Sequence, residues 1–114
     1  MRRLNFLFLH EMSLSGTLST NIGRLADLQF FQISTNAVTG TIPTEMANLS
    51  QLKVVWMHLN DMSGSIPSQV CDNRDGGLLE ILQVDCFPEE DPPVDCPCCT
   101  ACCNQETAFC ALNE

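Results

Sequence analysis

A regular internal repeat is the feature of this sequence that most constrains its fold. Gly16, Gly40 and Gly64 recur at one fixed interval, and the same offset aligns ten framework positions without a change of chemical type. Self-similarity at a period of roughly 24 residues predicts a solenoid, in which each coil buries its apolar side against the next. The ten aligned pairs are Leu25 and Leu49, Leu28 and Leu52, Phe31 and Val55, Ile33 and Met57, Asn36 and Asn60, Val38 and Met62, Gly40 and Gly64, Ile42 and Ile66, Pro43 and Pro67, and Met46 and Val70.

An earlier coil occupies the beginning of the chain. Met12 stands there where the later coils have Asn, and Ser19 stands where they have Pro. A solenoid needs capped ends because a bare terminal coil leaves its apolar edge in water. Since framework leucines begin at Leu4, we expect the stack to continue upstream, in a longer parent protein. The framework residues of this coil are Leu4, Leu7, Leu9, Leu14, Gly16, Leu18 and Ile22.

Each coil is predicted to contribute one short β-strand. Phe31 and Ile33 alternate with the two-residue period of a strand, which turns both side chains inward. Their neighbours Phe30, Gln32 and Ser34 then face outward. Stacked strands form a parallel sheet. The leucine spacing also fits amphipathic helices, but these would run through Gly-x-Ile-Pro segments, where Gly and Pro cost about 1 and about 3 kcal/mol.

Asparagine and glycine mark the two bends of each coil. Asn36 and Asn60 fall where the chain turns away from the strand, and an amide side chain has the donors and the acceptor to satisfy buried backbone groups there. Gly16, Gly40 and Gly64 permit a positive φ or a close backbone approach at the second bend. These five residues are predicted to be structural.

The segments Asn36–Pro43 and Asn60–Pro67 share the spelling N-x-(V/M)-x-G-x-I-P. This motif resembles the plant-type subclass of leucine-rich repeats, and the resemblance covers about residues 1–70. It implies an α/β solenoid, a right-handed coil of roughly three and a half repeats with a parallel β-sheet on the concave face. Proteins of this subclass are typically ectodomains of receptor-like kinases and receptor-like proteins, or secreted inhibitors of pathogen wall-degrading enzymes. The resemblance implies recognition of a protein, peptide or glycan on the concave side.

The acidic charge lies in the second part of the chain. The formal net charge is −9, yet residues 1–71 hold four basic and four acidic side chains, and residues 72–114 hold ten carboxylates and one Arg. This sign opposes binding to nucleic acid and to anionic lipid surfaces. No apolar run approaches the ~18–20 residues of a membrane span. We therefore expect no nucleic-acid partner and no direct membrane contact.

The repeats, residues 1–70, are predicted to end in a capping coil at residues 71–86. Leu79–Val84 is the expected fourth strand, with Leu82 and Val84 inward, and the step from Val55 to Leu82 is longer than the repeat by three positions. Residues 71–77 are predicted to be a loop that holds this extra length. Residues 87–95 are predicted to be an acidic, Pro-rich linker, and residues 96–114 an irregular Cys-rich tail.

Eight cysteines, an even number, favour four disulfides in an extracellular fold class. A bridge between Cys71 and Cys86, or from either to the later cluster, would hold the capping coil in place. A zinc site that uses the ligand spacing of Cys99 and Cys102, and a catalytic dithiol, are the alternatives. The connectivity is open. The cysteines are Cys71, Cys86, Cys96, Cys98, Cys99, Cys102, Cys103 and Cys110.

Outward strand positions of successive coils form columns, with strands about 4.8 Å apart. Grouped outward aromatics mark a contact surface, although a neighbouring domain or upstream coils are alternative partners for them. The first column holds Phe6, Phe30 and Val54, the second holds Phe8, Gln32, Trp56 and Gln83, and the third holds His10, Ser34, His58 and Asp85. The predicted ligand-binding residues are Phe6, Phe8, His10, Phe30, Gln32, Ser34, Val54, Trp56 and His58.

The third column contains the residue types of a serine hydrolase. The serine lies on a regular strand without a strained elbow or evident oxyanion donors, so solvated polar side chains are the simpler interpretation. A metal shared by His10 and His58 is a further alternative. Asn48-Leu-Ser50 is an N-glycosylation sequon, unless Asn48 only closes a helical turn.

Together these features predict a non-catalytic recognition module with no cofactor and no metal. Its expected ligand is a protein or peptide on the concave face, and its expected location is extracellular or at the cell surface, in a secreted protein or a membrane protein's ectodomain. A structural spacer without a specific ligand, and a scaffold that carries a metal-binding Cys-rich tail, are the alternatives.

Overall fold

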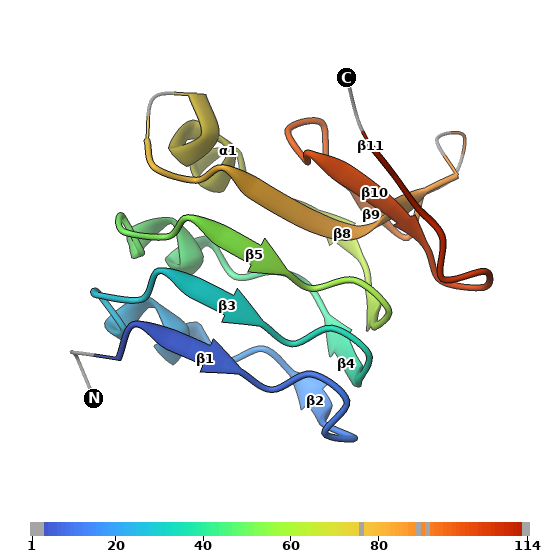
Figure 1. Ribbon diagram of the computed structural model, residues 1–114, viewed down its shortest axis with the longest axis horizontal. Helices are drawn as coiled ribbons and strands as arrows, with labels where there is room; N and C mark the ends of the chain where they lie inside the picture. Colours follow the sequence, from blue (N-terminus) through green and yellow to red (C-terminus); the bar gives the residue numbers. More distant parts are fainter. Residues whose placement is uncertain (1–3, 76, 89, 91, 113–114) are drawn as a thin grey trace.

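Stacked coils form a front and a back layer around one apolar core. The structure, a computed structural model, describes residues 4–75, 77–88, 90 and 92–112 of the 114. The front layer is a six-stranded sheet in the order β1-β3-β5-β8-β10-β11 (Figure 1). Neighbouring strands from β1 to β10 are parallel, and β11 is antiparallel to β10. Its strands are β1 (Phe6–Phe8), β3 (Phe30–Gln32), β5 (Val54–Trp56), β8 (Ile81–Phe87), β10 (Ala101–Asn104) and β11 (Cys110–Leu112).

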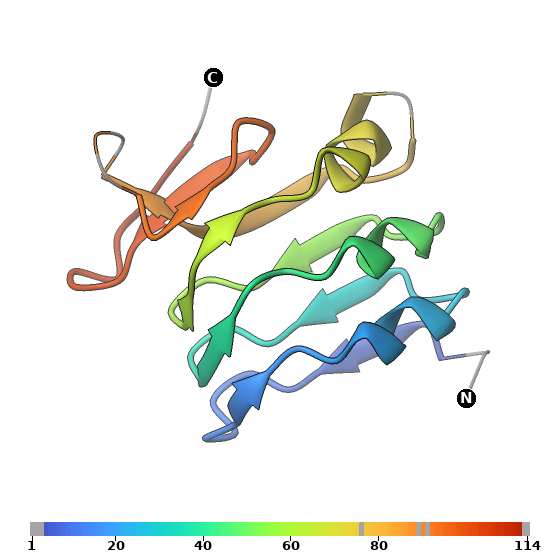
Figure 2. The same ribbon diagram turned by 180° about the vertical axis from the view of Figure 1, so that it is seen from behind.

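The back layer consists of short strands and helical turns (Figure 2). A three-stranded sheet in the order β2-β4-β6 is followed by turns that pack one on the next, η1 on η2 and η2 on α1. A two-stranded parallel pair, β7 and β9, lies outside both sheets. The elements are β2 (Ser15–Thr17), η1 (Thr20–Arg24), β4 (Ala37–Gly40), η2 (Thr44–Asn48), β6 (Asp61–Met62), β7 (Gly64–Ser65), α1 (Ser68–Asp75) and β9 (Val94–Asp95).

Strand pairing follows the repeat read from the sequence. Phe6 pairs with Phe30, and Phe30 pairs with Val54, each one repeat further along the chain. Val55 pairs with Leu82 across the predicted longer step. Residues at equivalent positions of successive repeats therefore pair with one another across the sheet.

The inward framework positions make the core between the layers. Phe31, Leu28 and Leu52 are each at most 1% exposed. Burial of apolar surface from water is the main stabilising contribution of such a core. The largest fully buried side chains are Phe31, Leu28, Met46, Leu49, Leu52, Met57, Leu79, Leu82, Val55, Val70, Val84 and Val94.

Asparagine side chains join consecutive coils at the first bend. Asn36 Oδ1 accepts from the backbone N–H groups of Met12 and Leu14, both at 2.9 Å. Its Nδ2 donates to the carbonyls of Leu9 and Ile33, both at 2.8 Å. Asn36 thus satisfies backbone groups of the coil before it as well as its own, which is the predicted role of this position.

Glycine is needed at the second bend for two reasons. Gly16, Gly40 and Gly64 all have φ of +83°, as the sequence predicted. A Cβ on Gly40 would lie 2.9 Å from Thr17 Cγ2, and one on Gly64 would lie 3.0 Å from Thr41 Cγ2. At the last two of these glycines, the close stacking of coils adds a steric reason to the conformational one.

The helical turns begin after proline where the sequence places them, but the last one is longer than predicted. Pro43 caps η2, which carries the fully buried Met46, and Val70 is buried on α1. Residues 71–75 continue α1 rather than form a loop. The prediction of a loop over residues 71–77 is wrong there, because part of the extra length extends the helical turn. Within the described ranges, no helix is long and apolar enough to cross a membrane.

The Cys-rich tail is not irregular. β10 continues the front sheet beside β8, and β11 folds back on β10 as a hairpin. The segment predicted to be a linker, residues 87–95, ends in β9. There Val94 is 1% exposed, and β9 pairs with β7. The tail therefore adds two strands to the front sheet, which the acidic, aperiodic sequence did not indicate.

Four disulfides hold this end together, and none of the eight cysteines, all of which lie in the described ranges, is free. Cys71 and Cys86, the residues that bracket the capping coil, both bridge to the later cluster. Cys99 and Cys102 belong to different bridges, so their zinc-ligand spacing is not used as such in the oxidised protein. The pairs are Cys71–Cys98, Cys86–Cys102, Cys96–Cys99 and Cys103–Cys110.

Candidate functional site

The outward side of the six-stranded sheet, called the front face below, carries an aromatic cluster at its β1 end. Phe6 and Phe8 are 53% and 50% exposed, and their ring centroids are 6.1 Å apart. Phe30, on the next strand, lies 5.1 Å from Phe6 between ring centroids. Exposed aromatic groups of this kind are typical of contact surfaces. All three residues face outward, as predicted.

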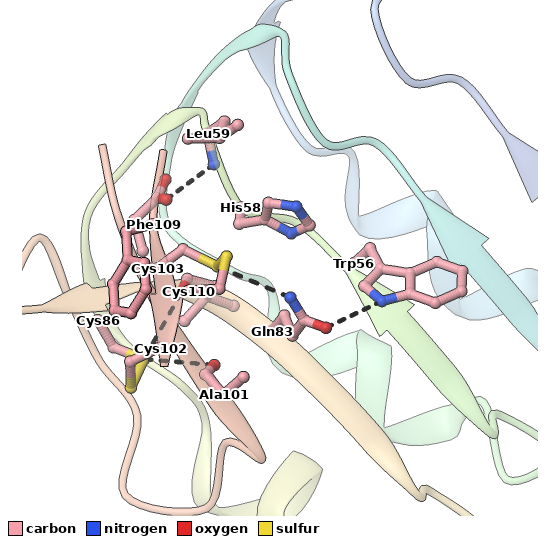
Figure 3. Close-up of a disulfide and its surroundings, with 12 residues drawn as sticks. Trp56, His58, Leu59, Gln83, Cys86, Ala101, Cys102, Cys103, Phe109 and Cys110 are labelled. Atoms are coloured by element: carbon pink, nitrogen blue, oxygen red, sulfur yellow. Dashed lines mark hydrogen bonds between the residues drawn. A yellow bond between two sulfur atoms is a disulfide. The ribbon is translucent and has the colours of Figure 1, made fainter. Parts of the chain in front are cut away.

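Towards the cap, the front face presents an amide and indole row (Figure 3). The half-buried Trp56 donates from Nε1 to Gln83 Oε1 at 3.1 Å. Gln83 Nε2 in turn lies 3.7 Å from Cys103 Sγ. The row thus connects strand β5 through β8 to the disulfide-bonded hairpin, and it fixes the orientation of both polar side chains.

Two predicted contact residues are not accessible. Ser34 and Val54 are 4% and 8% exposed. The Ser34 hydroxyl lies 3.3 Å from its hydrogen-bond partner Gln32 Nε2, and Val54 pairs with Phe30 and Ile81 on its two sides. Small side chains between larger neighbours are covered by them, so the prediction that both lie open to a ligand is wrong.

The partly exposed His58 and the buried Asp85 form a polar junction at the far side of the front face. Asp85, 2% exposed, accepts from the N–H of Leu59 at 2.7 Å and from that of Asn60 at 3.0 Å. Burial raises the pKa of the Asp85 carboxyl, against the lowering effect of these two N–H groups, the Gln105 amide and His58. Burial lowers the pKa of His58, and the nearby Asp85 charge opposes that shift in part.

These contacts do not make a hydrolytic triad. The Asp85 carboxylate binds backbone N–H groups, and the Ser34 hydroxyl accepts from Gln32. His58 Nδ1 is buried and has no hydrogen-bond partner among the described residues. In a triad, an aspartate orients the histidine through that nitrogen, and the histidine bonds the serine. Ser34, His58 and Asp85 thus lie in one column, but they do not make the hydrogen bonds of a triad.

We expect the fold to lose stability through His58 as the pH falls below about 6.5, where the unfolded chain takes up the proton. The pKa of His58 is lowered in the fold, so between that value and 6.5 the unfolded chain binds more protons. Urea midpoints at pH 7.5 and 5.5 measure the loss. The glutamine of His58→Gln cannot be protonated, so the difference between the two midpoints should be smaller in this variant. An unchanged difference would contradict a role for His58.

The remaining predicted residues lie apart from this junction. His10 is exposed just after β1, and no metal-ligating cluster with three or more members in the described ranges includes it. The alternative of a metal shared by His10 and His58 therefore has no support among the described residues. Asn48 is exposed at the end of η2, so glycan attachment there stays a prediction.

One part of the front face, the Cys103–Cys110 bridge, was not predicted from the sequence. Cys103 pairs with Cys110 across the β10–β11 hairpin. Gln83 pairs with Ala101, two residues before Cys103, which places the bridge on the same side as Trp56 and Gln83. The available signal for a hairpin was Asn104, whose Oδ1 accepts from the Glu106 N–H at 2.9 Å in the turn.

Similar solved structures are plant receptor ectodomains. The sequence matches no protein-family model and no curated protein. The chain is similar to the plant peptide hormone receptor RGFR1 in complex with RGF2, with a TM-score of 0.65 and 26% identity, covering 76% of this chain and 13% of that chain. It is also similar to the leucine-rich-repeat ectodomain of the plant membrane receptor kinase GASSHO1/SCHENGEN3 from Arabidopsis thaliana, in complex with CASPARIAN STRIP INTEGRITY FACTOR 2. That TM-score is 0.56 with 22% identity, covering 83% of this chain and 13% of that chain.

The repeat, the fold and these likenesses define the class of protein. This is a plant-type leucine-rich-repeat protein with a receptor-like fold, closed by four disulfides at its Cys-rich end. The predicted resemblance is thereby confirmed. Disulfides persist in oxidising surroundings, and together with the ectodomain likeness they indicate an extracellular protein.

Proposed function

We propose that the front face is a non-catalytic recognition surface for a peptide or an extended protein segment. The ligand would lie across the strands, over the aromatic cluster and the Trp56–Gln83 row. The contact residues that we propose are Phe6, Phe8, His10, Phe30, Gln32, Trp56 and His58.

The observation that carries this proposal is the exposure of Phe6 and Phe8 beside Phe30 on the same face as Trp56. Aromatic anchors supply most of the binding free energy in many interfaces. Support also comes from the two similar structures, both of which are complexes with named ligands. The front-face columns consist mainly of uncharged side chains, which favours an amphipathic segment over a highly charged one.

We further propose that the front face is the concave side of a right-handed coil of roughly three and a half repeats, within a longer stack. An apolar hollow of about 180 Å³ supports the longer stack. Framework leucines of the first coil, including Leu7, Leu9 and Leu18, line it, and another coil would cover them. The parent protein would be secreted or held at the cell surface.

Replacing Trp56 by alanine tests the recognition surface. Peptides selected from a random display library on the intact protein are the ligands, and calorimetry measures their Kd. We expect Trp56→Ala to weaken binding by about 30-fold, the loss of one hot-spot residue of about 2 kcal/mol. The loss of stability should stay below that of a fully buried aromatic residue, since Trp56 is partly exposed, and urea unfolding measures it separately from the Kd.

Thr39→Ala is the matched control, because Thr39 is exposed on strand β4 of the back layer. It should leave the Kd unchanged. A structural spacer is the competing function. It would yield no saturable peptide, or peptides whose Kd is the same for Trp56→Ala and the parent, and either result would reject the proposed surface.

A further inference from the structure

His58 lies against the Cys103–Cys110 disulfide at the cap end of the front face (Figure 3). One ligand atom from each of His58, Cys103 and Cys110 can be chosen so that all three lie within 4.8 Å of one another. They come from three different segments, the chain after β5, strand β10 and strand β11. The fold therefore brings together a nitrogen and two sulfurs, the ligand types of zinc sites.

The imidazole has ligand capacity that the fold does not use. Nδ1 of His58 is buried and has no hydrogen-bond partner within the part of the chain that the structure describes. Buried polar atoms of this kind are uncommon and call for an explanation. Imidazole nitrogen is a common zinc ligand, and among the described residues nothing competes with a metal for Nδ1 of His58.

The two sulfurs become ligands when a thiol reduces the bridge. An external thiolate attacks Cys110 Sγ, which belongs to the more exposed partner, and the Cys103 thiolate leaves. A second external thiolate then displaces the Cys110 thiolate from the mixed disulfide. In total, two reductant thiols become one disulfide while the bridge becomes two protein thiols.

The surroundings favour opening at this bridge. Gln83 Nε2 lies 3.7 Å from Cys103 Sγ, so the leaving thiolate has a donor in place. The bridge closes a sequence separation of only 7, against 27 for Cys71–Cys98 and 16 for Cys86–Cys102, so its loss releases less chain entropy. Cys96 and Cys99 have a shorter separation, but both are buried. The β10–β11 pairing and the bond from Gln105 to the Asn60 carbonyl remain to hold the hairpin.

We propose that thiol reduction of Cys103–Cys110 creates a Cys2His site for Zn²⁺ on the front face. A tetrahedral zinc ion with Zn–S of about 2.3 Å holds its two sulfurs about 3.8 Å apart, a separation that the opened bridge is free to adopt. Metal binding releases the two thiol protons. The fourth position is left to water. This inference does not depend on peptide recognition.

Limited reduction of the folded chain with dithiothreitol tests the proposal. Alkylation and peptide mass analysis identify which pair opens first, and Co²⁺, added without alkylation to a parallel sample, serves as the spectroscopic probe for zinc. We expect Cys103 and Cys110 to be labelled first. The reduced chain should bind one Co²⁺ with thiolate charge-transfer bands and the visible bands of tetrahedral cobalt, and Zn²⁺ should displace it.

His58→Gln distinguishes this site from adventitious thiolate binding. It should weaken Co²⁺ binding by more than about tenfold, because even second-shell changes in metal sites cost about 10–100-fold. The matched control is His10→Gln, which changes an exposed histidine on the same face. The reduced His10→Gln chain should bind Co²⁺ with the affinity of the reduced parent chain. Prior opening of another bridge, absence of the cobalt bands, or equal affinity in His58→Gln would each overturn the proposal. Circular dichroism of the unreduced variants confirms that they fold.

Discussion

Phe31→Ala is expected to destabilise the fold by about 3–5 kcal/mol, the usual cost of deleting a buried aromatic side chain. Phe31 is 1% exposed in the middle of the front sheet and packs in the core cluster. Its strand pairs with β1 on one side and β5 on the other, so neighbouring coils have little freedom to close the cavity. Urea unfolding at pH 7.5 measures the change in the free energy of unfolding.

Phe30→Ala is the matched control for this change. Phe30 is adjacent in the chain and equal in size, but its side chain is partly exposed on the front face beside Phe6. We expect a loss well below that of Phe31→Ala, because less apolar surface returns to water and no closed cavity forms. Equal losses for both variants would contradict the inward and outward assignment on which the proposed contact surface rests.

The sequence predicted the repeats well because one physical requirement fixes them. Each coil must place its apolar residues in register with the next, and a change of one residue would turn a strand's inward set outward. This is why the pairing of Val55 with Leu82 could be predicted across a step longer than the repeat. The same requirement predicted the positions of Phe31, Met46 and Val70 in the core.

The candidate site was only partly predictable. Strand parity gives the side of the sheet on which a residue lies, but exposure also depends on the size of its neighbours, and this buries Ser34 and Val54. The cap was missed for a different reason. In residues 96–112 disulfides take over the role of a periodic apolar pattern, so neither β10 nor the position of Cys103–Cys110 leaves a hydrophobic signal in the sequence.

Asn60→Ala is expected to cost about 2–4 kcal/mol, because the amide satisfies buried backbone groups of two coils. Its Oδ1 accepts from the Val38 N–H at 3.1 Å. Its Nδ2 donates to the carbonyls of Ile33 at 3.0 Å and Met57 at 3.1 Å. The Ile33 carbonyl keeps a second donor in Asn36, so in Asn60→Ala the Val38 N–H and the Met57 carbonyl are the groups that lose a hydrogen-bond partner. Asn60 is 3% exposed, and water does not readily replace the amide.

Two variants separate this role from a loss of packing. Asn36→Ala removes the equivalent amide one coil earlier, where the side chain is partly exposed and water replaces part of its bonds, so we expect a loss of about 1 kcal/mol. Asn60→Asp keeps the acceptor for the Val38 N–H but sets a carboxylate oxygen against the carbonyls of Ile33 and Met57. At pH 7 it should be at least as unstable as Asn60→Ala, and protonation in acid should recover part of the loss, since the acid can donate. If Asn60→Asp were as stable as the parent at pH 7, donation by Nδ2 would not be what holds these coils together.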